Sequence, residues 1–452
     1  MTSLDTSIFK SYDIRGTYPD QLDESIAAGV AKGFISLLKP TQMVLGRDGR
    51  TSGPSLHQIM VKTITAAGID VIDIGMVSSD MYYYACATRK LPGIMITASH
   101  NPKEYNGFKM VRQIPYFFTG DNEIKEIKDM IIADKFPDYS VSTTGNHTQI
   151  DIMVEFIDYI TKLVDISGFK SFTIVADTAN GMVGPILDAI KPKLPSIDLV
   201  PMYFKPDGNF PNHGGDPLQE ENRQDVVAKI QSTKADLGVM FDPDGDRFFV
   251  IDRHQRFIPG DFMTAILAEY FLHRHPNANI VYDIRASKVV PETIAQNGGH
   301  SFANRIGHSY IKKRMIDEKA IFGGEVTGHY YFADFFHCDT GIVTLLILLD
   351  YLSHSTQSLD QLMDQLLQKY FISGEINSHV ESVPNVLQKI EAHYQNLAQE
   401  ILHVDGISAE FDEWRFNVRG SNTEPLIRLN LEANNAQLLE QKRDEVLALI
   451  RS

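Results

Sequence analysis

Ser99 is the first residue whose type and position could support covalent chemistry. It lies in the polar segment Thr-Ala-Ser-His-Asn-Pro at 97–102, directly after the apolar run 94–96. An apolar run of this length is typical of a short buried strand, and a small polar loop after such a strand exposes its side chains at the carboxyl edge of a sheet, where open α/β proteins bind ligands. We therefore predict that Ser99 is a nucleophile or a carrier of phosphate; the plainer alternative is a polar turn without a role.

A second chemical segment contains alternating carboxylates. Asp242, Asp244 and Asp246 follow the apolar run 237–241. Three carboxylates this close repel one another unless a cation neutralises them, and such hard oxygen ligands favour Mg²⁺ over Zn²⁺. A calcium-binding EF-hand is excluded because its sixth and twelfth positions, which require Gly and Glu, are Arg247 and Arg253. The sequence predicts a magnesium site, against the alternative of an acidic turn.

Two further loops suit the ends of a phosphorylated sugar. The Gly-rich segment 324–329 brings together Glu325, Thr327 and His329, which suit sugar hydroxyls because a carboxylate can accept from two vicinal hydroxyls. Near the C-terminus, 419–428 combines fixed cations, hydroxyls and a glycine, a composition that holds a phosphate dianion without a metal. The predicted phosphate-binding residues are Arg419, Gly420, Ser421, Asn422, Thr423 and Arg428.

These loops follow a repeated α/β pattern. The strand-like run 43–46 lies between the helical stretches 21–38 and 55–67, and strand-like runs recur at 173–177 and 280–283. Alternating strands and helices predict an open, mostly parallel sheet. Each of the three units has a later strand that ends in one of the polar loops, so we expect a triplicated α/β domain whose loops face a common cleft.

Length predicts three or four domains. At 452 residues the chain exceeds what one core usually serves, since a domain takes about 150 residues. After Tyr370 the pattern changes to a smaller α+β module. We expect an α/β protein with three similar mixed-sheet α/β domains and a C-terminal α+β domain around a central cleft. The predicted bounds are 1–150, 151–253, 254–370 and 371–452.

Composition excludes several classes of partner. The net charge is −16, with 58 acidic and 42 basic residues, so no diffuse basic surface exists to bind nucleic acid. The two cysteines form no CxxC motif, which argues against a disulfide framework or a structural zinc site. No run of 18 apolar residues occurs. We expect a soluble, cytoplasmic protein without a nucleic-acid or membrane partner.

Together the segments favour phosphoryl transfer over hydrolysis. A hydrolase needs one phosphate site, whereas two phosphate sites with a sugar site between them suit the movement of a phosphoryl group between two positions of one molecule. If Ser99 carries the phosphate, Lys109 and Arg247 would offset charge on the phosphoryl oxygens.

The same segments resemble the α-D-phosphohexomutase superfamily, specifically its bacterial phosphomannomutase/phosphoglucomutase branch. The resemblance covers essentially the full length. It is carried in order by Tyr-Asp-Ile-Arg-Gly at 12–16, the loop at 97–102, Asp-Pro-Asp-Gly-Asp-Arg at 242–247, Gly-Glu-Val-Thr-Gly-His at 324–329, and Arg-Gly-Ser-Asn-Thr-Glu-Pro-Leu-Ile-Arg at 419–428.

The resemblance implies that hexose 1-phosphate and hexose 6-phosphate, of mannose, glucose or both, are interconverted through phosphorylated Ser99. Hexose 1,6-bisphosphate would be the intermediate and activator, and the enzyme would be a monomer or a homodimer. Mg²⁺ would be held by Ser99 and the three aspartates. Sugar contacts would come from Glu325, Val326, Thr327, Gly328 and His329. Further cleft residues would be Tyr12, Arg15, Lys109, Arg247, Arg285 and His308, with Lys109 and His329 as candidates for the general acid/base.

Three alternatives stay open at this point. A phosphoglucosamine mutase of the same superfamily commonly has Gln where this chain has Val326, which cannot donate a hydrogen bond. In the phosphomannomutase/phosphoglucomutase branch itself, Ser is more common than Thr at the position of Thr327, and the extra methyl group of threonine can alter which sugar is preferred. A haloacid-dehalogenase-type phosphatase would use Asp242 as nucleophile, and a non-catalytic sugar-phosphate sensor would bind ligand without labelling Ser99.

Overall fold

The computed structural model describes residues 4–137, 143–420 and 426–452. The chain divides into two compact units, Met1–Ile258 with Thr327–Thr356, and Pro259–Val326 with Gln357–Ser452. The bounds of these two compact units do not coincide with the four domain bounds expected from the sequence, so those four bounds remain a prediction.

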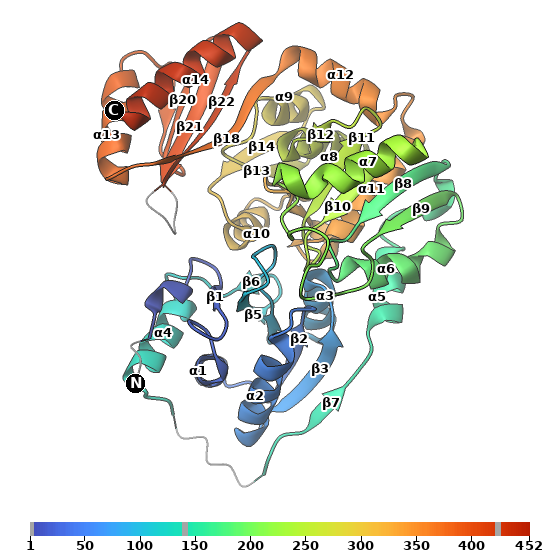
Figure 1. Cartoon of the computed structure of the whole chain (residues 1–452), viewed down its shortest axis with the longest axis vertical. Helices are drawn as coiled ribbons and strands as arrows, with labels where there is room; N and C mark the ends of the chain where they lie inside the picture. Colours follow the sequence, from blue (N-terminus) through green and yellow to red (C-terminus); the bar gives the residue numbers. More distant parts are fainter. Residues whose placement is uncertain (1–3, 138–142, 421–425) are drawn as a thin grey trace. The chain divides into compact units, whose positions relative to one another are not determined.

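The first sheet of the first unit is mixed. Its strand order is β1-β5-β4-β2-β3-β7, with β6 paired to β5 (Figure 1). The strands are β1 (Ile14–Thr17), β2 (Gln42–Arg47), β3 (Asp70–Met76), β4 (Gly93–Ile96), β5 (Tyr105–Gln113), β6 (Tyr116–Phe117) and β7 (His147–Gln149). The helices are α1 (Glu24–Leu38), α2 (Gly53–Ala66), α3 (Ser79–Arg89) and α4 (Glu123–Ala133).

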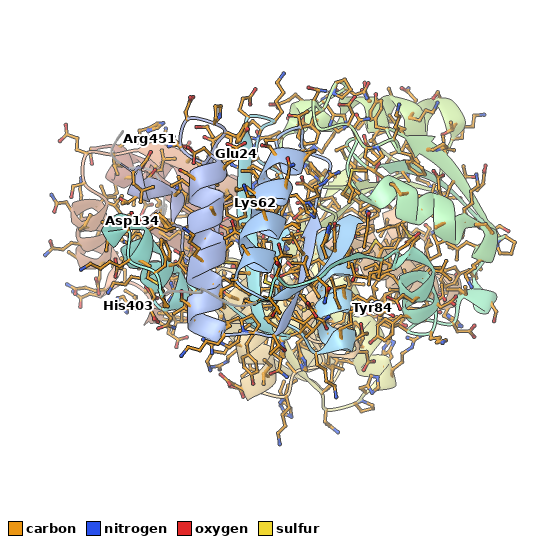
Figure 2. All side chains as sticks on the ribbon, turned by 90° about the horizontal axis from the view of Figure 1, so that it is seen from below. Glu24, Lys62, Tyr84, Asp134, His403 and Arg451 are labelled. Atoms are coloured by element: carbon orange, nitrogen blue, oxygen red, sulfur yellow. The ribbon has the colours of Figure 1, made fainter. Side chains whose placement is uncertain are left out.

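One face of this sheet is covered by α1, α2 and α4. Leu45, Ile94 and Phe108 belong to the same buried cluster as Phe34 of α1 and Leu56 of α2. Figure 2 shows α1 and α2 side by side, with Glu24 at the start of α1 and Lys62 on α2. Successive strand residues point to opposite faces, and all four residues of β4 are buried, so both faces of this strand are covered. Being buried on both faces, β4 can present polar groups only at its carboxyl end.

The second sheet repeats the central pattern of the first. Its order is β12-β11-β10-β8-β9, with β10 parallel to β8 and antiparallel to β11, as β4 is parallel to β2 and antiparallel to β5. The strands are β8 (Phe172–Asp177), β9 (Ile197–Met202), β10 (Leu237–Phe241), β11 (Phe248–Asp252) and β12 (Phe257–Ile258), and the helices are α5 (Met153–Ile160), α6 (Val183–Ile190) and α7 (Gln224–Thr233). The unit also contains β16 (Tyr330–Phe332), β17 (Cys338–Asp339) and α11 (Gly341–His354).

The second unit contains a third parallel arrangement and an antiparallel sheet. In the former, β15 is parallel to β13, and β13 is parallel to β14. Its elements are α8 (Gly260–Arg274), β13 (Asn279–Asp283), α9 (Val289–Gln296), β14 (His300–Asn304), α10 (His308–Asp317), β15 (Phe322–Gly324) and α12 (Leu359–Lys369). The strands β4, β10 and β15 each end at one of the predicted chemical loops, which confirms the triplicated α/β pattern.

The C-terminal sheet is antiparallel in the order β18-β22-β21-β20-β19. Its strands are β18 (Phe371–His379), β19 (Glu400–Leu402), β20 (Ile407–Glu410), β21 (Trp414–Gly420) and β22 (Leu426–Ala433), covered by α13 (Val383–Tyr394) and α14 (Ala436–Arg451). The predicted C-terminal α+β module is therefore confirmed. Short 3-10 helices lie at Thr6–Ile8, Ile166–Gly168, Lys191–Lys193, Glu220–Arg223 and Ala333–Phe335. Within the described ranges, no helix is long and apolar enough to cross a membrane.

Candidate active site

Ser99 is held in an uncommon backbone conformation beside the aspartate cluster. It lies three residues after β4 with a φ of +49°, a region that non-glycine residues enter at a cost of about 1–3 kcal/mol unless the surroundings enforce it. Its hydroxyl donates to Asp242 Oδ2 over 2.8 Å, and its N–H donates to Thr97 Oγ1 over 2.9 Å. The predicted nucleophile and the first predicted metal ligand are therefore in direct contact.

A buried guanidinium holds this loop in shape. Arg50 is 1% exposed and donates to four backbone carbonyls of the Ser99 loop and the residues just after it. One terminal nitrogen, NH2, reaches Ser99 and Asn101, each at 2.6 Å. The other, NH1, reaches Pro102 at 2.7 Å and Tyr105 at 2.9 Å. A lysine has three donors on one atom and could not span these carbonyls, so the planar fork of arginine is required here.

Asp48 links Arg50 to the strand before the loop. Its Oδ2 accepts from Arg50 Nε at 3.2 Å and from Thr97 Oγ1 at 2.7 Å, and Thr97 in turn accepts the Ser99 N–H. Asp48 follows β2, the parallel neighbour of β4. The carboxyl ends of β2 and β4 are therefore adjacent, and a hydrogen-bond network runs from Asp48, which follows β2, to the backbone of Ser99, which follows β4.

The three aspartates converge as predicted. Carboxylate oxygens of Asp242, Asp244 and Asp246 lie within 4.8 Å of one another, and all three residues are buried. Asp244 Oδ1 and Asp246 Oδ1 have no hydrogen-bond partner among the described residues. Buried anionic oxygens without donors are costly unless a cation binds them. The donor set, all hard oxygen, fits Mg²⁺, so these residues could hold that ion.

Lys109 supplies positive charge to the same cluster. Its ammonium lies 2.7 Å from Asp244 Oδ2 and 2.5 Å from Asp246 Oδ2. Burial by itself would lower the pKa of Lys109, but the two carboxylates outweigh burial and raise it. Burial likewise opposes ionisation of Asp244, yet its ion pair with Lys109 lowers the pKa of that carboxyl, whereas burial and then its two acidic neighbours raise the pKa of Asp242. Lys109 is a fixed cation in this arrangement.

Ser79, at the start of α3, supports the aspartate loop from behind. Its hydroxyl donates to Asp244 Oδ2 over 2.7 Å, its N–H donates to the Asp244 carbonyl over 2.8 Å, and it accepts from Lys109 Nζ at 3.2 Å. The next residue, Asp80, accepts from Thr340 Oγ1 at 2.7 Å. The N-terminus of α3 therefore connects the aspartate loop to the segment before α11.

Two arginines flank Ser99. Arg15, on β1, donates through NH1 to Asn101 Oδ1 over 2.8 Å and to the Ala98 carbonyl over 3.3 Å, and Asp13 anchors its Nε at 2.6 Å. Tyr12 interacts electrostatically with Arg15. Arg247 Nε lies 3.8 Å from Asp242 Oδ2, and the backbone of Arg247 forms a β-bridge with His329. Arg15 thus contacts the loop that carries Ser99, and Arg247 belongs to the loop that carries the aspartates.

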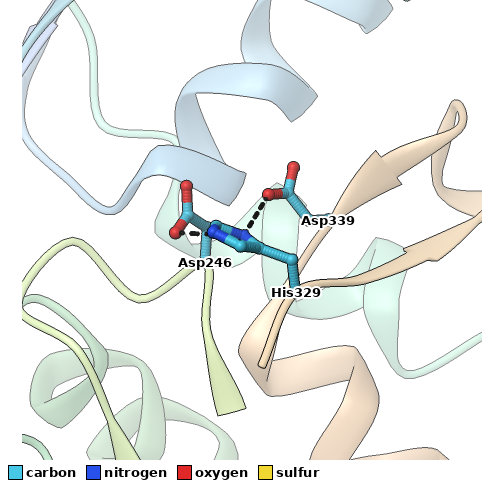
Figure 3. A group of neighbouring side chains, drawn as sticks. All are labelled: Asp246, His329 and Asp339. Carbon is cyan, nitrogen blue, oxygen red and sulfur yellow. Dashed lines mark hydrogen bonds and ion pairs between the residues drawn. The ribbon is translucent and has the colours of Figure 1, made fainter. Parts of the chain in front are cut away.

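His329 is oriented by two carboxylates (Figure 3). Its Nδ1 lies 2.7 Å from Asp339 Oδ2 and 3.7 Å from Asp246 Oδ1. Fixing one ring nitrogen in this way leaves Nε2 to exchange a proton with a ligand. Gly328, which precedes it, has a φ of +84° and packs on Phe249 so closely that a Cβ would lie 2.6 Å from the ring. The turn that carries Thr327, Gly328 and His329 therefore requires glycine at this point.

The rest of the predicted sugar loop belongs to the second unit, since the boundary falls between Val326 and Thr327. Glu325 is buried and accepts the Gly307 N–H at 3.3 Å, one residue before His308, the first residue of α10. Arg285 interacts electrostatically with Glu325. Within this unit, the structure brings three predicted residues, Glu325, Arg285 and His308, around the end of β15.

The predicted phosphate-binding arginines also lie together in the second unit. Arg419 on β21 is directly opposite Arg428 on β22, and both contact Glu375 of β18. Gly420 ends β21. Ser421, Asn422 and Thr423 lie outside the described residues, so their part in this site stays a prediction.

Several residues of the site were not found from the sequence. Arg50, Asp48, Ser79, Asp339 and Glu375 stand in no loop to which we gave a role. The one sequence signal for any of these residues was the Arg-Asp-Gly-Arg run at 47–50. Charged residues directly after a buried strand need partners of opposite charge if they are themselves buried. His100 was missed as well. Its Nδ1 lies 3.3 Å from Ser99 Oγ, and burial, together with Arg247 and Arg15, lowers its pKa well below the usual value.

Family models match almost the whole chain. The models described as phosphoglucomutase/phosphomannomutase domains match in order: alpha/beta/alpha domain I at 6–138, domain II at 154–255, domain III at 259–370 and the C-terminal domain at 375–449. The four predicted motif loops fall one within each of these ranges.

Individual proteins agree with the family models. The chain is 36% identical over 450 residues to a phosphomannomutase of Salmonella montevideo, covering 98% of this chain and 99% of that protein. It is also 36% identical to a protein named phosphohexose mutases of Xanthomonas campestris pv. campestris, covering 98% and 99%. A crystal structure of a phosphoglucomutase/phosphomannomutase family protein from Burkholderia thailandensis matches with a TM-score of 0.89 at 31% identity, covering 99% and 98%. The chain belongs to the phosphoglucomutase/phosphomannomutase family and is a phosphohexose mutase, an isomerase of sugar phosphates.

Proposed function

We propose that this enzyme interconverts hexose 1-phosphate and hexose 6-phosphate, of mannose, glucose or both, by way of a phosphorylated Ser99 and a hexose 1,6-bisphosphate. The observation that carries this proposal is the contact between Ser99 Oγ and Asp242 within a buried cluster of three carboxylates. A simple polar turn would not place a serine hydroxyl against a buried cluster of three carboxylates, two of which have an oxygen without a hydrogen-bond partner among the described residues.

We propose that Ser99, Asp242, Asp244 and Asp246 hold Mg²⁺. Bound there, the ion supplies positive charge to the transferring phosphoryl group. The protein contributes further charge of its own, because Lys109 is fixed between two aspartates while Arg15 and Arg247 flank Ser99. Such preorganised cations stabilise a transferring phosphoryl group without reorganising during the reaction.

In the first half-reaction, the bond between Ser99 Oγ and phosphorus breaks and the free sugar hydroxyl forms a bond to the same phosphorus. The hydroxyl proton must go to a base, and the departing Ser99 oxygen takes up one proton, so that the serine hydroxyl is restored. The geometry favours His329 over Lys109 as this base. The Lys109 ammonium is already bound by two aspartates, whereas Asp339 contacts only one of the two ring nitrogens of His329. In the second half-reaction, the bisphosphate presents its other phosphate and these bond changes run in reverse.

Sugar recognition is proposed to involve Glu325, Val326, Thr327, Gly328 and His329, with Tyr12, Arg285 and His308 as further contacts. The phosphate that does not react would be bound by Arg419, Gly420, Ser421, Asn422, Thr423 and Arg428. Val326 offers no side-chain donor, so we favour mannose and glucose phosphates over glucosamine phosphate as substrates. A monomer or homodimer is proposed as the active form, to be checked by light scattering.

Intact-mass measurement with a peptide map tests this proposal. After incubation with glucose 1,6-bisphosphate and Mg²⁺, the protein should gain one phosphate on the peptide that contains Ser99, and Ser99→Ala should neither gain it nor turn over substrate. A Ser99→Ala protein with full activity and a label on an aspartate would contradict it. Rates with mannose 1-phosphate, glucose 1-phosphate and glucosamine 6-phosphate then decide the preferred sugar.

A further inference from the structure

Glu375 on β18 is the meeting point of three guanidinium groups. Its Oε2 lies 3.2 Å from Arg285 NH1 and 3.4 Å from Arg419 NH2, and its Oε1 lies 2.6 Å from Arg428 NH1. All four residues belong to the second unit. Three guanidinium groups thus meet at the carboxylate of Glu375, at the place where the family resemblance expects a substrate phosphate to bind, and Arg285 also pairs with Asp283.

The fold forces these cations together. Arg419 and Arg428 are paired directly across β21 and β22, and like charges in directly opposed positions destabilise a sheet. Arg285 follows β13 and is anchored by Asp283, which accepts from its Nε at 3.0 Å. Without a counter-ion the three guanidiniums would repel one another.

The loop that carries Arg285 is itself fixed to the C-terminal sheet. Arg415 on β21 donates through NH1 to the Ala286 carbonyl and through NH2 to the Ile284 carbonyl at 3.2 Å. Glu432 on β22 accepts the Lys288 N–H at 2.9 Å. The backbone that carries Arg285 is therefore fixed beside the two strands that carry Arg419 and Arg428.

Glu375 uses donors that a phosphate would also use. Carboxylate and phosphate oxygens accept hydrogen bonds from guanidinium forks in similar geometry. Although burial opposes ionisation of Glu375, Arg285, Arg428 and Arg419 outweigh it and lower its pKa, so the side chain is an anion at neutral pH. A bound phosphate dianion must share the arginines with this carboxylate or displace it.

We propose that Glu375 is a positioning residue that acts as an internal competitor: it keeps Arg285, Arg419 and Arg428 converged while it weakens their hold on the phosphate that does not react. This inference rests on the proposed function, in which a bisphosphate must leave this site once per turnover to present its other end. A cation cluster without a competing anion would bind substrate and intermediate more tightly alike, which lowers KM without raising kcat.

Phosphate binding by the full-length protein tests the role of Glu375. Glu375→Gln keeps the shape of the side chain and removes its charge, and we expect the Kd for inorganic phosphate, measured by calorimetry without Mg²⁺, to fall about tenfold. Adding Arg428→Met to this variant should abolish the gain, which places the tighter site at this cluster. In turnover, Glu375→Gln should lower kcat and KM together, because release of the intermediate slows.

The matched control is Glu410→Gln. Glu410 belongs to the same unit and pairs with two cations, Lys288 at 3.1 Å and Arg415 at 2.7 Å, with a similar side-chain exposure of 21% against 25% for Glu375. This variant should bind phosphate like the wild type. If Glu375→Gln melts without cooperativity, Glu375→Ala replaces it, since alanine leaves no amide to oppose the arginines.

Unchanged or weaker phosphate binding by a folded Glu375 variant would overturn the proposal, because Glu375 would then only anchor the arginines. Phosphate affinity is measured without turnover. Failure of this inference therefore remains distinct from failure of Ser99 to carry phosphate.

Discussion

The molecule contains two charge clusters of opposite composition. In the first unit, three buried carboxylates surround one ammonium, that of Lys109. In the second unit, three guanidiniums surround one carboxylate, that of Glu375. Each cluster is short of one sign of charge, so one suits a metal cation and the other a phosphate anion. In each, one central counter-charge contacts at least two of the like charges, and a second one is bound at the edge: Arg247 beside Asp242, and Asp283 on Arg285.

The two clusters are built differently. Asp242, Asp244 and Asp246 come from one loop after a parallel strand, so their convergence follows from local sequence. Arg419 and Arg428 are instead brought opposite each other by the register of two antiparallel strands, and Arg285 comes from a loop more than a hundred residues earlier. A local cluster can be recognised as a motif, whereas a cluster built by register depends on the fold.

Metal removal should have the largest effect on the first cluster. Treatment with EDTA should lower kcat by about 1000-fold, since a bound cation supplies several kcal/mol of charge stabilisation to the transferring group. Mg²⁺ should restore activity. Phosphate binding at the second cluster, measured by calorimetry, should not change on EDTA treatment. Full activity in EDTA would show that Lys109 alone neutralises the aspartates during turnover.

Arg50→Lys should have the next largest effect, because the loop that carries Ser99 would lose most of its carbonyl contacts. A displacement of about 1 Å at a reacting group can cost about 100-fold in rate, and we expect a loss of this size in kcat with little change in KM. Phosphorylation of Ser99 by glucose 1,6-bisphosphate should slow in parallel. The control is Arg112→Lys, at an exposed ion pair with Glu123 on the same sheet. A wild-type kcat in Arg50→Lys would contradict a positioning role.

In the second cluster, Arg428→Lys should act on binding more than on chemistry. Lysine keeps the charge but cannot present a planar fork, so we expect KM for hexose phosphate to rise about tenfold while kcat changes less. Arg451→Lys, on the exposed end of α14, is the control, and it should leave KM unchanged. A loss confined to kcat would place Arg428 at the reacting phosphate instead.

The sequence predicted most of the local structure, namely helices, strands and the loops that directly follow strands. The helix expected at 21–38 lies at Glu24–Leu38 and the strand expected at 43–46 lies at Gln42–Arg47, because apolar spacing determines which face is buried. The positions of Ser99 and the aspartates after β4 and β10 followed from the same reasoning. Arg50 and Glu375 could not be predicted in this way. The carbonyls that Arg50 binds lie 49 to 55 residues away, and Arg285 lies 90 residues from Glu375; charged residues are usually exposed, so composition alone favours a surface position for both.

One buried acid lies behind each cluster, and the two permit a comparison by pH. Burial raises the pKa of Asp80, at the start of α3, to about 7, and burial also raises the pKa of Glu432 on β22 to about 7. Both values exceed those of an unfolded chain, about 3.9 and 4.3. The folded protein therefore holds these protons more tightly, and the resulting stability is complete below pH 4 and lost as the pH rises to 7.

Asp80→Asn and Glu432→Gln should each flatten this pH dependence, because an amide imitates the protonated carboxyl at every pH. We expect each residue to account for on the order of 4 kcal/mol between pH 4 and 7, which appears as a smaller difference in Tm between pH 5 and pH 7.5 than the wild type shows. Asp129→Asn, at an exposed position of α4, should leave that difference unchanged. The two acids lie in different compact units. If only one of the two variants keeps the pH dependence of Tm seen in the wild type, the unit that contains its substituted residue is not the one that melts first. A wild-type pH dependence in both would mean that these carboxyls are ionised in the folded protein.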